Sequence, residues 1–245
     1  MKKKLLLSAL LTLSAVVLVV ATVLTTIAFL AHQASVTNTF TMGNIMINLY
    51  ESSVDKDGNK IADDPNLHGD MKDSIGNTYQ LSPNGSYDKD PTVYVMPKSD
   101  DCIVFVQVQN GIRHVESATD ATYTCMYDQM EAKGWNFIGS NALGNVYVYN
   151  GEYPDATYPT DKEGLVISNS EEIQSFDMFT NFKIKNNASR EAVDGKTLSV
   201  NAYAIQKASF TRNDYLTRTE VEAAWNALVA NFDTALEITS TTPIS

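Results

Sequence analysis

The fold of this chain is constrained most by a series of short segments in which apolar and polar residues alternate. A period of two gives a β-strand one apolar face, and short continuous apolar runs are typical of strands buried on both faces. Residues 51–90 are polar and contain several glycines and prolines, which favours long loops with at most one short strand. The segments that predict strands lie at residues 92–96, 103–108, 145–149, 164–167, 182–184 and 198–205.

The alternation changes phase once, at Gly43. Apolar residues before it share one parity and those after it share the other: Val36, Phe40 and Met42, then Ile45, Ile47 and Leu49. A glycine at such a change predicts a bulge or a sharp bend between two separately paired segments.

Two helices are expected to interrupt the strands. Residues 121–133 favour a helix that stops at Gly134, and Thr219 with Glu222 has the pattern of a capping box at the start of a second helix. The first helix would place four residues near one face: Cys125, Met126, Gln129 and Met130. The second has the apolar stripe of an amphipathic helix, formed by Val221, Ala224, Trp225, Leu228 and Val229.

The N-terminus has the pattern of an export signal. Three lysines at residues 2–4 precede an uncharged, mostly apolar run at residues 5–31, and the small residues before Phe29 favour cleavage between Ala28 and Phe29. Residues 1–28 would then be a signal peptide. The run is also long enough to cross a bilayer, so an uncleaved anchor is the alternative interpretation.

The net charge of the chain limits which kinds of partner it is expected to bind. The chain has 18 basic and 29 acidic residues, and cleavage of the signal would remove three lysines and no acids. Such an acidic protein is not expected to bind nucleic acid or anionic membranes. Membrane contact is therefore expected only through the signal peptide before cleavage. Removal of residues 1–28 from the 245 would leave 217 residues, a length that fits one exported all-β domain.

Several segments resemble the TasA/camelysin family of secreted bacterial proteins, which are processed by a signal peptidase of the SipW type. That family has an aromatic residue at the mature N-terminus, and Phe29 fits this position. The most specific resembling block is NTFTMGNI at residues 38–45, and residues 87–93, 101–108 and 198–206 resemble later strand regions. The acidic residue that usually follows the mature N-terminus is absent here, where Ala-His-Gln stands at residues 31–33.

The strand pattern and this resemblance together predict an all-β, jelly-roll-type antiparallel sandwich at residues 44–245, with one or two peripheral helices. The resemblance implies a secreted subunit of biofilm matrix fibres, located in the extracellular matrix or at the cell surface. Its partners would be the SipW-type peptidase and further copies of itself, joined head to tail by donor-strand exchange. In this mechanism residues 29–43 fill a gap in the sheet of the next subunit, with Gly43 as the hinge. The donor residues would be Phe29, Val36, Phe40 and Met42. In the alternative interpretation, residues 36–49 form the first strand of their own domain.

We expect no enzymatic activity. Camelysin-type relatives have been labelled metalloproteases, but a zinc protease of the common kind needs two histidines one helical turn apart with a glutamate between them. His32, His68 and His114 are scattered and lie in no such context. A secreted metalloprotease is therefore the least favoured alternative.

A cell-surface adhesin or a carbohydrate-binding module is the other alternative. Its candidate binding residues are exposed aromatic side chains, namely Tyr147, Tyr149, Tyr153 and Tyr158. Packing in a core is the competing interpretation of these tyrosines.

No cofactor is expected, with calcium as the one alternative. Four oxygen-bearing residues have the spacing of a calcium loop: Asp55, Asp57, Asn59 and Asp63. However, Lys60 stands where such loops place a glycine, and Asn66 where they place a bidentate glutamate. An ordinary solvated turn is the competing interpretation.

Cys102 and Cys125 are the only cysteines. Because an exported protein meets oxidising conditions, we predict a disulfide between them. Two buried thiols that pack as small apolar groups are the alternative.

Overall fold

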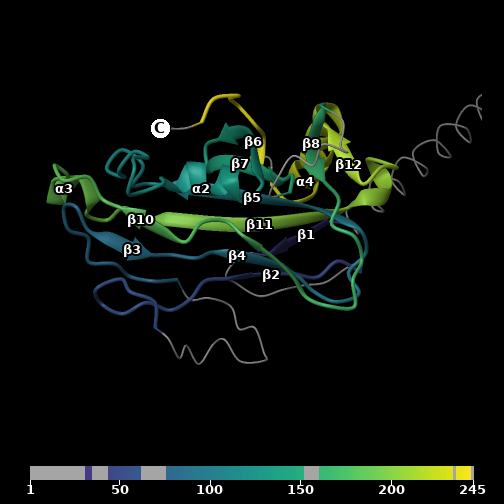
Figure 1. The fold of residues 1–245 in the computed structure, drawn as a ribbon. Helices are drawn as coiled ribbons and strands as arrows, with labels where there is room; N and C mark the ends of the chain where they lie inside the picture. The colour runs from purple at the N-terminus through teal and green to yellow at the C-terminus, as the bar shows by residue number, and fades with distance from the viewer. Residues whose placement is uncertain (1–30, 35–43, 62–75, 152–159, 234–235, 244–245) are drawn as a thin grey trace, which may run out of the picture.

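The computed structural model describes residues 31–34, 44–61, 76–151, 160–233 and 236–243. Its central element is a five-stranded antiparallel sheet (Figure 1). In spatial order its strands are β1 (Ala31–Ala34), β11 (Leu198–Gln206), β5 (Cys102–Asn110), β7 (Gly144–Tyr149) and β6 (Trp135–Asn141). Strands β5 and β11 are the longest, and all nine residues of each are paired with the other.

Three smaller antiparallel sheets surround this sheet. A three-stranded sheet lies against one face and contains β2 (Ile47–Tyr50), β4 (Thr92–Val95) and β9 (Gln174–Asp177). Two two-stranded sheets pair β3 (Ser86–Asp88) with β10 (Asn181–Lys183), and β8 (Lys162–Leu165) with β12 (Tyr215–Thr217). The helices are α2 (Met126–Ala132), α3 (Arg190–Val193) and α4 (Arg218–Asn231), with a short 3-10 turn at Lys207–Ser209.

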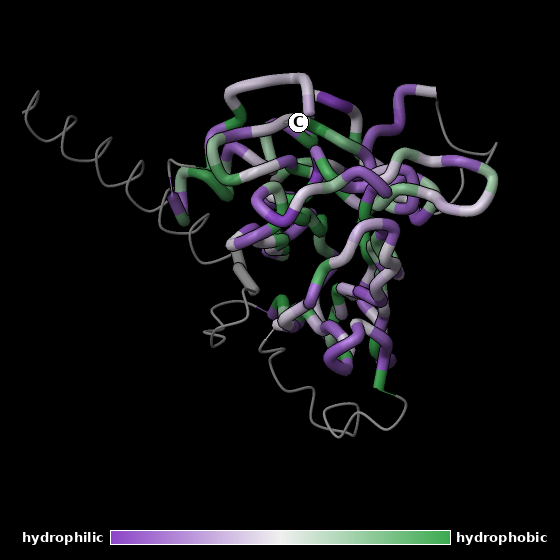
Figure 2. The backbone as a smooth tube through the Cα atoms, turned by 90° about the vertical axis from the view of Figure 1, so that its left-hand side faces the viewer, coloured by the Kyte–Doolittle hydropathy of each residue, from purple (hydrophilic) through white to green (hydrophobic). Residues whose placement is uncertain are grey.

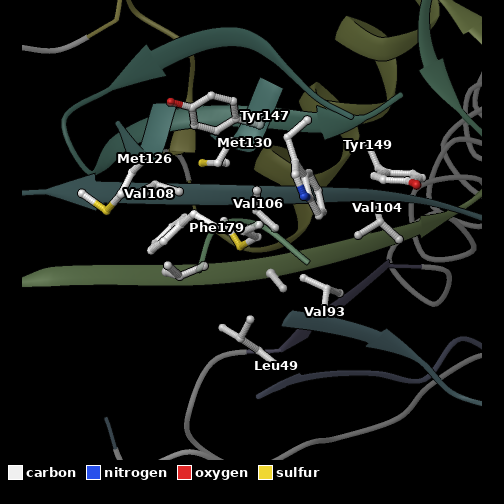
Figure 3. Close-up of a cluster of buried hydrophobic side chains, with 14 of the residues drawn as sticks. Leu49, Val93, Val104, Val106, Val108, Met126, Met130, Tyr147, Tyr149 and Phe179 are labelled. Carbon is white, nitrogen blue, oxygen red and sulfur yellow. The ribbon is translucent and has the colours of Figure 1, made fainter. Parts of the chain in front are cut away.

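Both faces of the five-stranded sheet are buried, which explains the continuous apolar run in β5. Val104, Val106 and Val108 belong to the larger cluster, where Leu49 and Val93 of the three-stranded sheet point toward β5 (Figure 3). Ile103 and Phe105 point the other way, into a second cluster that α4 covers. In the view turned by 90°, hydrophobic residues gather in the interior where these layers face one another (Figure 2).

The predicted all-β class is confirmed. The described chain is mainly antiparallel strands with few helices, and a strand occupies each of the six segments predicted from alternation, with ends shifted by up to two residues. Ile45, Ile47 and Leu49 are all buried, as their shared parity predicts. Gly43, the predicted hinge, lies outside the described residues. Strands β6, β9 and β12 were not predicted; β6 shows no regular alternation, because a bulge between Phe137 and Gly139 interrupts its register.

The first predicted helix is shorter than its sequence suggests. Helix α2 begins at Met126 rather than near residue 121, because the Asp120 carboxylate accepts hydrogen bonds from the backbone N–H groups of Thr122 and Tyr123 and holds a turn there. The chain leaves the helix at Gly134, whose φ of 84° favours glycine. Met126 and Met130 are its buried residues.

The second predicted helix has the expected apolar stripe, but its first residues differ from those predicted. Val221, Ala224, Trp225 and Leu228 are buried. The capping box is formed by Thr217 and Glu220, two residues earlier than predicted, whereas Glu222 accepts a hydrogen bond from Arg218 at 2.7 Å. Helix α4 therefore follows β12 without an intervening loop.

Trp225 should be a main source of stability for the layer between α4 and the sheet. Its ring centroid lies 5.4 Å from that of Phe105 and 5.5 Å from that of Tyr203, and its indole N–H donates to the Leu236 carbonyl at 3.0 Å. We expect Trp225→Ala to lower the free energy of unfolding by about 3–5 kcal/mol, because it leaves a cavity in a closed core. Urea unfolding followed by circular dichroism measures this. The control is Asn226→Ala on the exposed side of the same helix, which should change stability by less than about 0.5 kcal/mol.

Candidate functional site: an open strand edge beside a groove

A groove of about 1410 Å³ lies between the start of β11 and the end of β2. Its lining is partly apolar and includes Leu49, Ile112, Phe182, Ile184, Val193, Leu198 and Val200. The loop at residues 76–83 and the segment at residues 188–197, which contains α3, form further parts of its wall. The groove therefore brings together chain segments that are up to about 150 residues apart in the sequence.

Strand β11 presents part of its backbone to this groove. The Gly111 N–H donates to the Thr197 carbonyl, and residues alternate along an antiparallel ladder between the two sides of a strand. Thr197, Ser199 and Asn201 therefore direct their backbone groups toward β5, whereas Leu198 and Val200 direct theirs toward the groove. Among the described residues, no strand pairs with Leu198 or Val200 on that side.

The next part of the same edge is covered by the N-terminal region. Strand β1 pairs antiparallel with β11, from Ala31 opposite Ile205 to Ala34 opposite Ala202. The four described residues of the predicted donor segment therefore lie on the edge of their own sheet. Phe29, Val36, Phe40 and Met42 lie outside the described residues, as do the predicted cleavage site after Ala28 and the apolar run at residues 5–30. None of the helices in the described part of the chain is long and apolar enough to cross a membrane.

A buried ion pair stands in the wall of the groove. The Lys89 ammonium lies 2.5 Å from a Glu51 carboxylate oxygen, and the two side chains are only 6% and 10% exposed. Glu51 also accepts hydrogen bonds from the Asn77 amide at 2.7 Å and from the Tyr79 hydroxyl at 3.3 Å. Burial next to this carboxylate raises the pKa of Tyr79, so the hydroxyl stays a donor. The network joins the end of β2 to the loop at residues 76–83 and fixes the shape of the groove.

The predicted calcium loop is a hydrogen-bonded turn where it is described. The Asp55 carboxylate accepts the backbone N–H groups of Asp57 and Asn59, both at 2.9 Å, and the bond from Asn59 is the main cause of its lowered pKa. Asp57 pairs instead with Lys56. Asp63 lies outside the described residues, and the described part of the chain holds no group of three or more residues able to ligate a metal. Calcium binding stays an untested alternative.

The predicted disulfide is absent from the structure, in which Cys102 at the start of β5 and Cys125 just before α2 are free thiols. Cys102 is the first residue of β5. Cys125 precedes Met126, whose N–H donates to Glu116, and Glu116 accepts a bond from Asn110 at the other end of β5. Figure 3 shows Met126 beside Val108, away from Val104. The two ends of this strand are roughly 26 Å apart at 3.3 Å per residue, whereas bridged Cα atoms are about 4.4–6.8 Å apart.

Where the structure describes them, the candidate residues of the two other functional classes do not form a site. Tyr147 and Tyr149, proposed for carbohydrate binding, are 3% and 9% exposed and pack in the core, while Tyr153 and Tyr158 lie outside the described residues. His114 is exposed and His68 lies outside the described residues. His32 is in β1, on the edge of β11.

Glu116 is a buried carboxyl group that the sequence did not single out. It is 7% exposed and accepts hydrogen bonds from the Tyr123 hydroxyl and the Met126 N–H, both at 2.7 Å. Burial raises the pKa of Glu116 above its usual value of 4.5, and these hydrogen bonds oppose the rise. Through them, Glu116 fixes the start of α2 against the end of β5.

Comparisons of the chain with models of protein families, with curated proteins and with solved structures found no match. The candidate site therefore rests on the geometry of the groove and the open edge.

The cysteine arrangement predicts two free thiols of unequal reactivity. Burial raises the pKa of Cys102 to about 12, and nearby Asp101 and Asp100 add to the effect. Cys125 is half-buried and should react first. We expect intact mass measurement after iodoacetamide treatment without reductant to show one adduct on the native protein and two on the denatured protein. A denatured protein that takes no adduct would establish a disulfide instead.

Because the pKa of Glu116 is raised in the folded protein, we predict that the free energy of unfolding falls as the pH rises. Its pKa is raised in the folded state, so between about pH 4.5 and that raised pKa the folded protein holds a proton that the unfolded chain has released. The contribution of Glu116 to stability is therefore greatest below pH 4.5 and falls as the pH rises. Urea unfolding from pH 4 to pH 7 should show a smaller fall for Glu116→Gln than for the wild type. The control, exposed Glu131→Gln, should follow the wild type.

Proposed function

We propose that this chain is a secreted structural subunit of extracellular matrix fibres, related to the TasA/camelysin family. In this proposal the strands form a jelly-roll-type sandwich. Subunits join head to tail when the N-terminal donor segment of one copy, residues 29–43, enters the groove of the next. The observation that supports it is that no strand in the described part of the chain pairs with Leu198 or Val200 on the side of β11 that faces a groove of about 1410 Å³.

The edge suits an extended peptide better than a small molecule. Strand addition supplies backbone hydrogen bonds to free N–H and C=O groups, and alternate side chains of the added strand fill an adjacent groove. Strand β11 offers nine residues, and β1 pairs with four of them, from Ala202 to Ile205. A donor of fifteen residues is long enough to cover the whole strand.

The pairing of β1 suggests how exchange begins. A segment held on its own sheet by four residue pairs can be replaced by the same segment of another copy, because the same kinds of hydrogen bond are lost and regained. If the incoming donor keeps the register of β1, Val36 lies opposite Val200 and Asn38 opposite Leu198. Signal cleavage before Phe29 would free the donor from the membrane and allow this step.

The mixed lining of the groove fits such a donor. The proposed donor contains no charged residue, since residues 29–43 read FLAHQASVTNTFTMG. Its apolar side chains would contact Leu198, Val200 and their apolar neighbours. The ion pair of Lys89 and Glu51 satisfies its own charges, so a neutral donor need not neutralise it.

Assembly should be blocked by a proline at residue 200. Val200→Pro removes a backbone N–H directed toward the groove, while the hydrogen bonds of Ser199 and Asn201 to β5 stay in place. We expect mature Val200→Pro protein to keep its circular dichroism spectrum and to stay monomeric by electron microscopy and sedimentation. The control Val200→Thr keeps the N–H and a branched side chain, and should form fibres. Fibres of folded Val200→Pro as abundant as those of the control would contradict exchange at this edge.

A cross-linking experiment identifies the donor. Two differently tagged mature proteins, both with Cys125→Ser, carry Val36→Cys or Val200→Cys, so a bond between these two cysteines can form only between copies. We expect a mixed disulfide product that carries both tags. A control pair with Val36→Cys and Ser175→Cys on β9 should give little product. Equal yields from the two pairs would count against the proposed register.

A further inference from the structure

Strand β6 forms the other edge of the five-stranded sheet, opposite the edge used in the proposed function. It pairs with β7 on one side. Its seven residues, WNFIGSN, include no charged residue and no proline, although both commonly protect natural edge strands from pairing with another chain. Apart from its bulge, this edge depends on other parts of the chain for protection.

The C-terminal strap, defined here as residues 236–243, covers the far end of β6 in the manner of a strand. The Ser140 N–H donates to the Ser240 carbonyl at 2.8 Å, and the Ser140 carbonyl accepts from the N–H groups of Thr239 at 2.8 Å and Ser240 at 3.1 Å. The Ser140 hydroxyl donates to the Thr242 carbonyl at 2.8 Å. Both backbone groups of Ser140 are thus occupied by the strap.

The strap is fixed on both sides of this contact. The Leu236 carbonyl accepts two hydrogen bonds, from the Asn141 amide at 2.8 Å and from the Trp225 indole at 3.0 Å. Ile238 packs so closely on Gly139 that a Cβ added there would lie 2.5 Å from its Cγ2 atom. The neighbouring Ile138 carbonyl accepts a hydrogen bond from Arg218 of α4 at 2.6 Å.

We infer that the C-terminal strap masks the Ser140 end of β6 as a second strand-accepting edge, and that this end, once bare, pairs antiparallel with the same end of β6 in a second copy. The strap already makes hydrogen bonds of the kind that an added strand would make. A second copy is the occupant that the edge fits, because pairing two β6 strands around a two-fold axis places uncharged residues opposite one another despite the acidic net charge of each chain. This contact closes as a dimer, unlike the head-to-tail contact at β11.

The test compares two substitutions at one residue of the strap. Ser240→Pro removes the N–H that donates to Ser140, whereas Ser240→Ala keeps every backbone group of the strap. Both are placed in the mature protein with Val200→Pro. Sedimentation equilibrium should give an association constant for dimer formation that is at least tenfold larger for Ser240→Pro than for Ser240→Ala. At low protein concentration, hydrogen exchange at the Ser140 amide should be faster in Ser240→Pro than in Ser240→Ala. It should become slower at higher concentration, where the Ser240→Pro dimer forms.

A truncated protein keeps the inference testable if Ser240→Pro fails to fold. Ending the chain after Ile238 keeps the Leu236 hydrogen bonds and the packing on Gly139, but removes the groups that bond to Ser140. If the folded proline variant or the folded truncated protein forms this dimer, the inference holds; if every folded variant stays as monomeric as Ser240→Ala, it is wrong. The test also separates this inference from the proposed function, on which its Val200→Pro background rests. If Val200→Pro does not stop fibres, the Ser240→Pro and Ser240→Ala proteins both form fibres. If the strap inference is wrong, the two proteins do not differ in dimerisation.

Discussion

The pairing of β5 with β11 is the interaction on which the rest of the structure depends. All nine residues of one strand are paired with nine of the other, and side chains leave this ladder in two directions into two separate cores. The three-stranded sheet packs on one side, and Trp225 of α4 packs on the other. Among the described residues, β1 occupies only part of the second side of β11, so the same ladder also presents the backbone of Leu198 and Val200 to the groove.

Sequence periodicity identified which side chains are buried much better than which strands are neighbours. The shared parity of Ile45, Ile47 and Leu49 and the stripe that contains Trp225 each predict a buried face, because burial leaves a regular mark every two or every three to four residues. No comparable mark shows that β1 lies next to β11, since the residues that pair are about 170 positions apart. The open edge was therefore invisible in the sequence, although it consists of residues in a correctly predicted strand.

The features that the sequence predicts wrongly or does not reveal also depend on contacts between distant parts of the chain. A disulfide was expected from the number of cysteines, but the length of β5 keeps Cys102 and Cys125 apart. The ion pair between Glu51 and Lys89 joins residues that are 38 positions apart and lie just outside β2 and β3, so only the folded chain brings them into contact. The capping box was misplaced by two residues because Thr217 and Thr219 both precede acidic residues at the required spacing. In that case the end of β12, rather than local preference, selects the start of the helix.

The position of β1 has a consequence for the order in which the protein can fold. Residues 31–34 complete a sheet edge that is supplied by residues 202–205, so nearly the whole chain must be present before the first strand has a partner. Contacts between residues so distant in sequence form slowly, because a long loop must close before they yield any free energy. In the proposed export of this chain from its N-terminus, β1 would therefore stay without its partner strand until the last fifth of the chain has emerged, whereas strands such as β5, β6 and β7 can pair earlier.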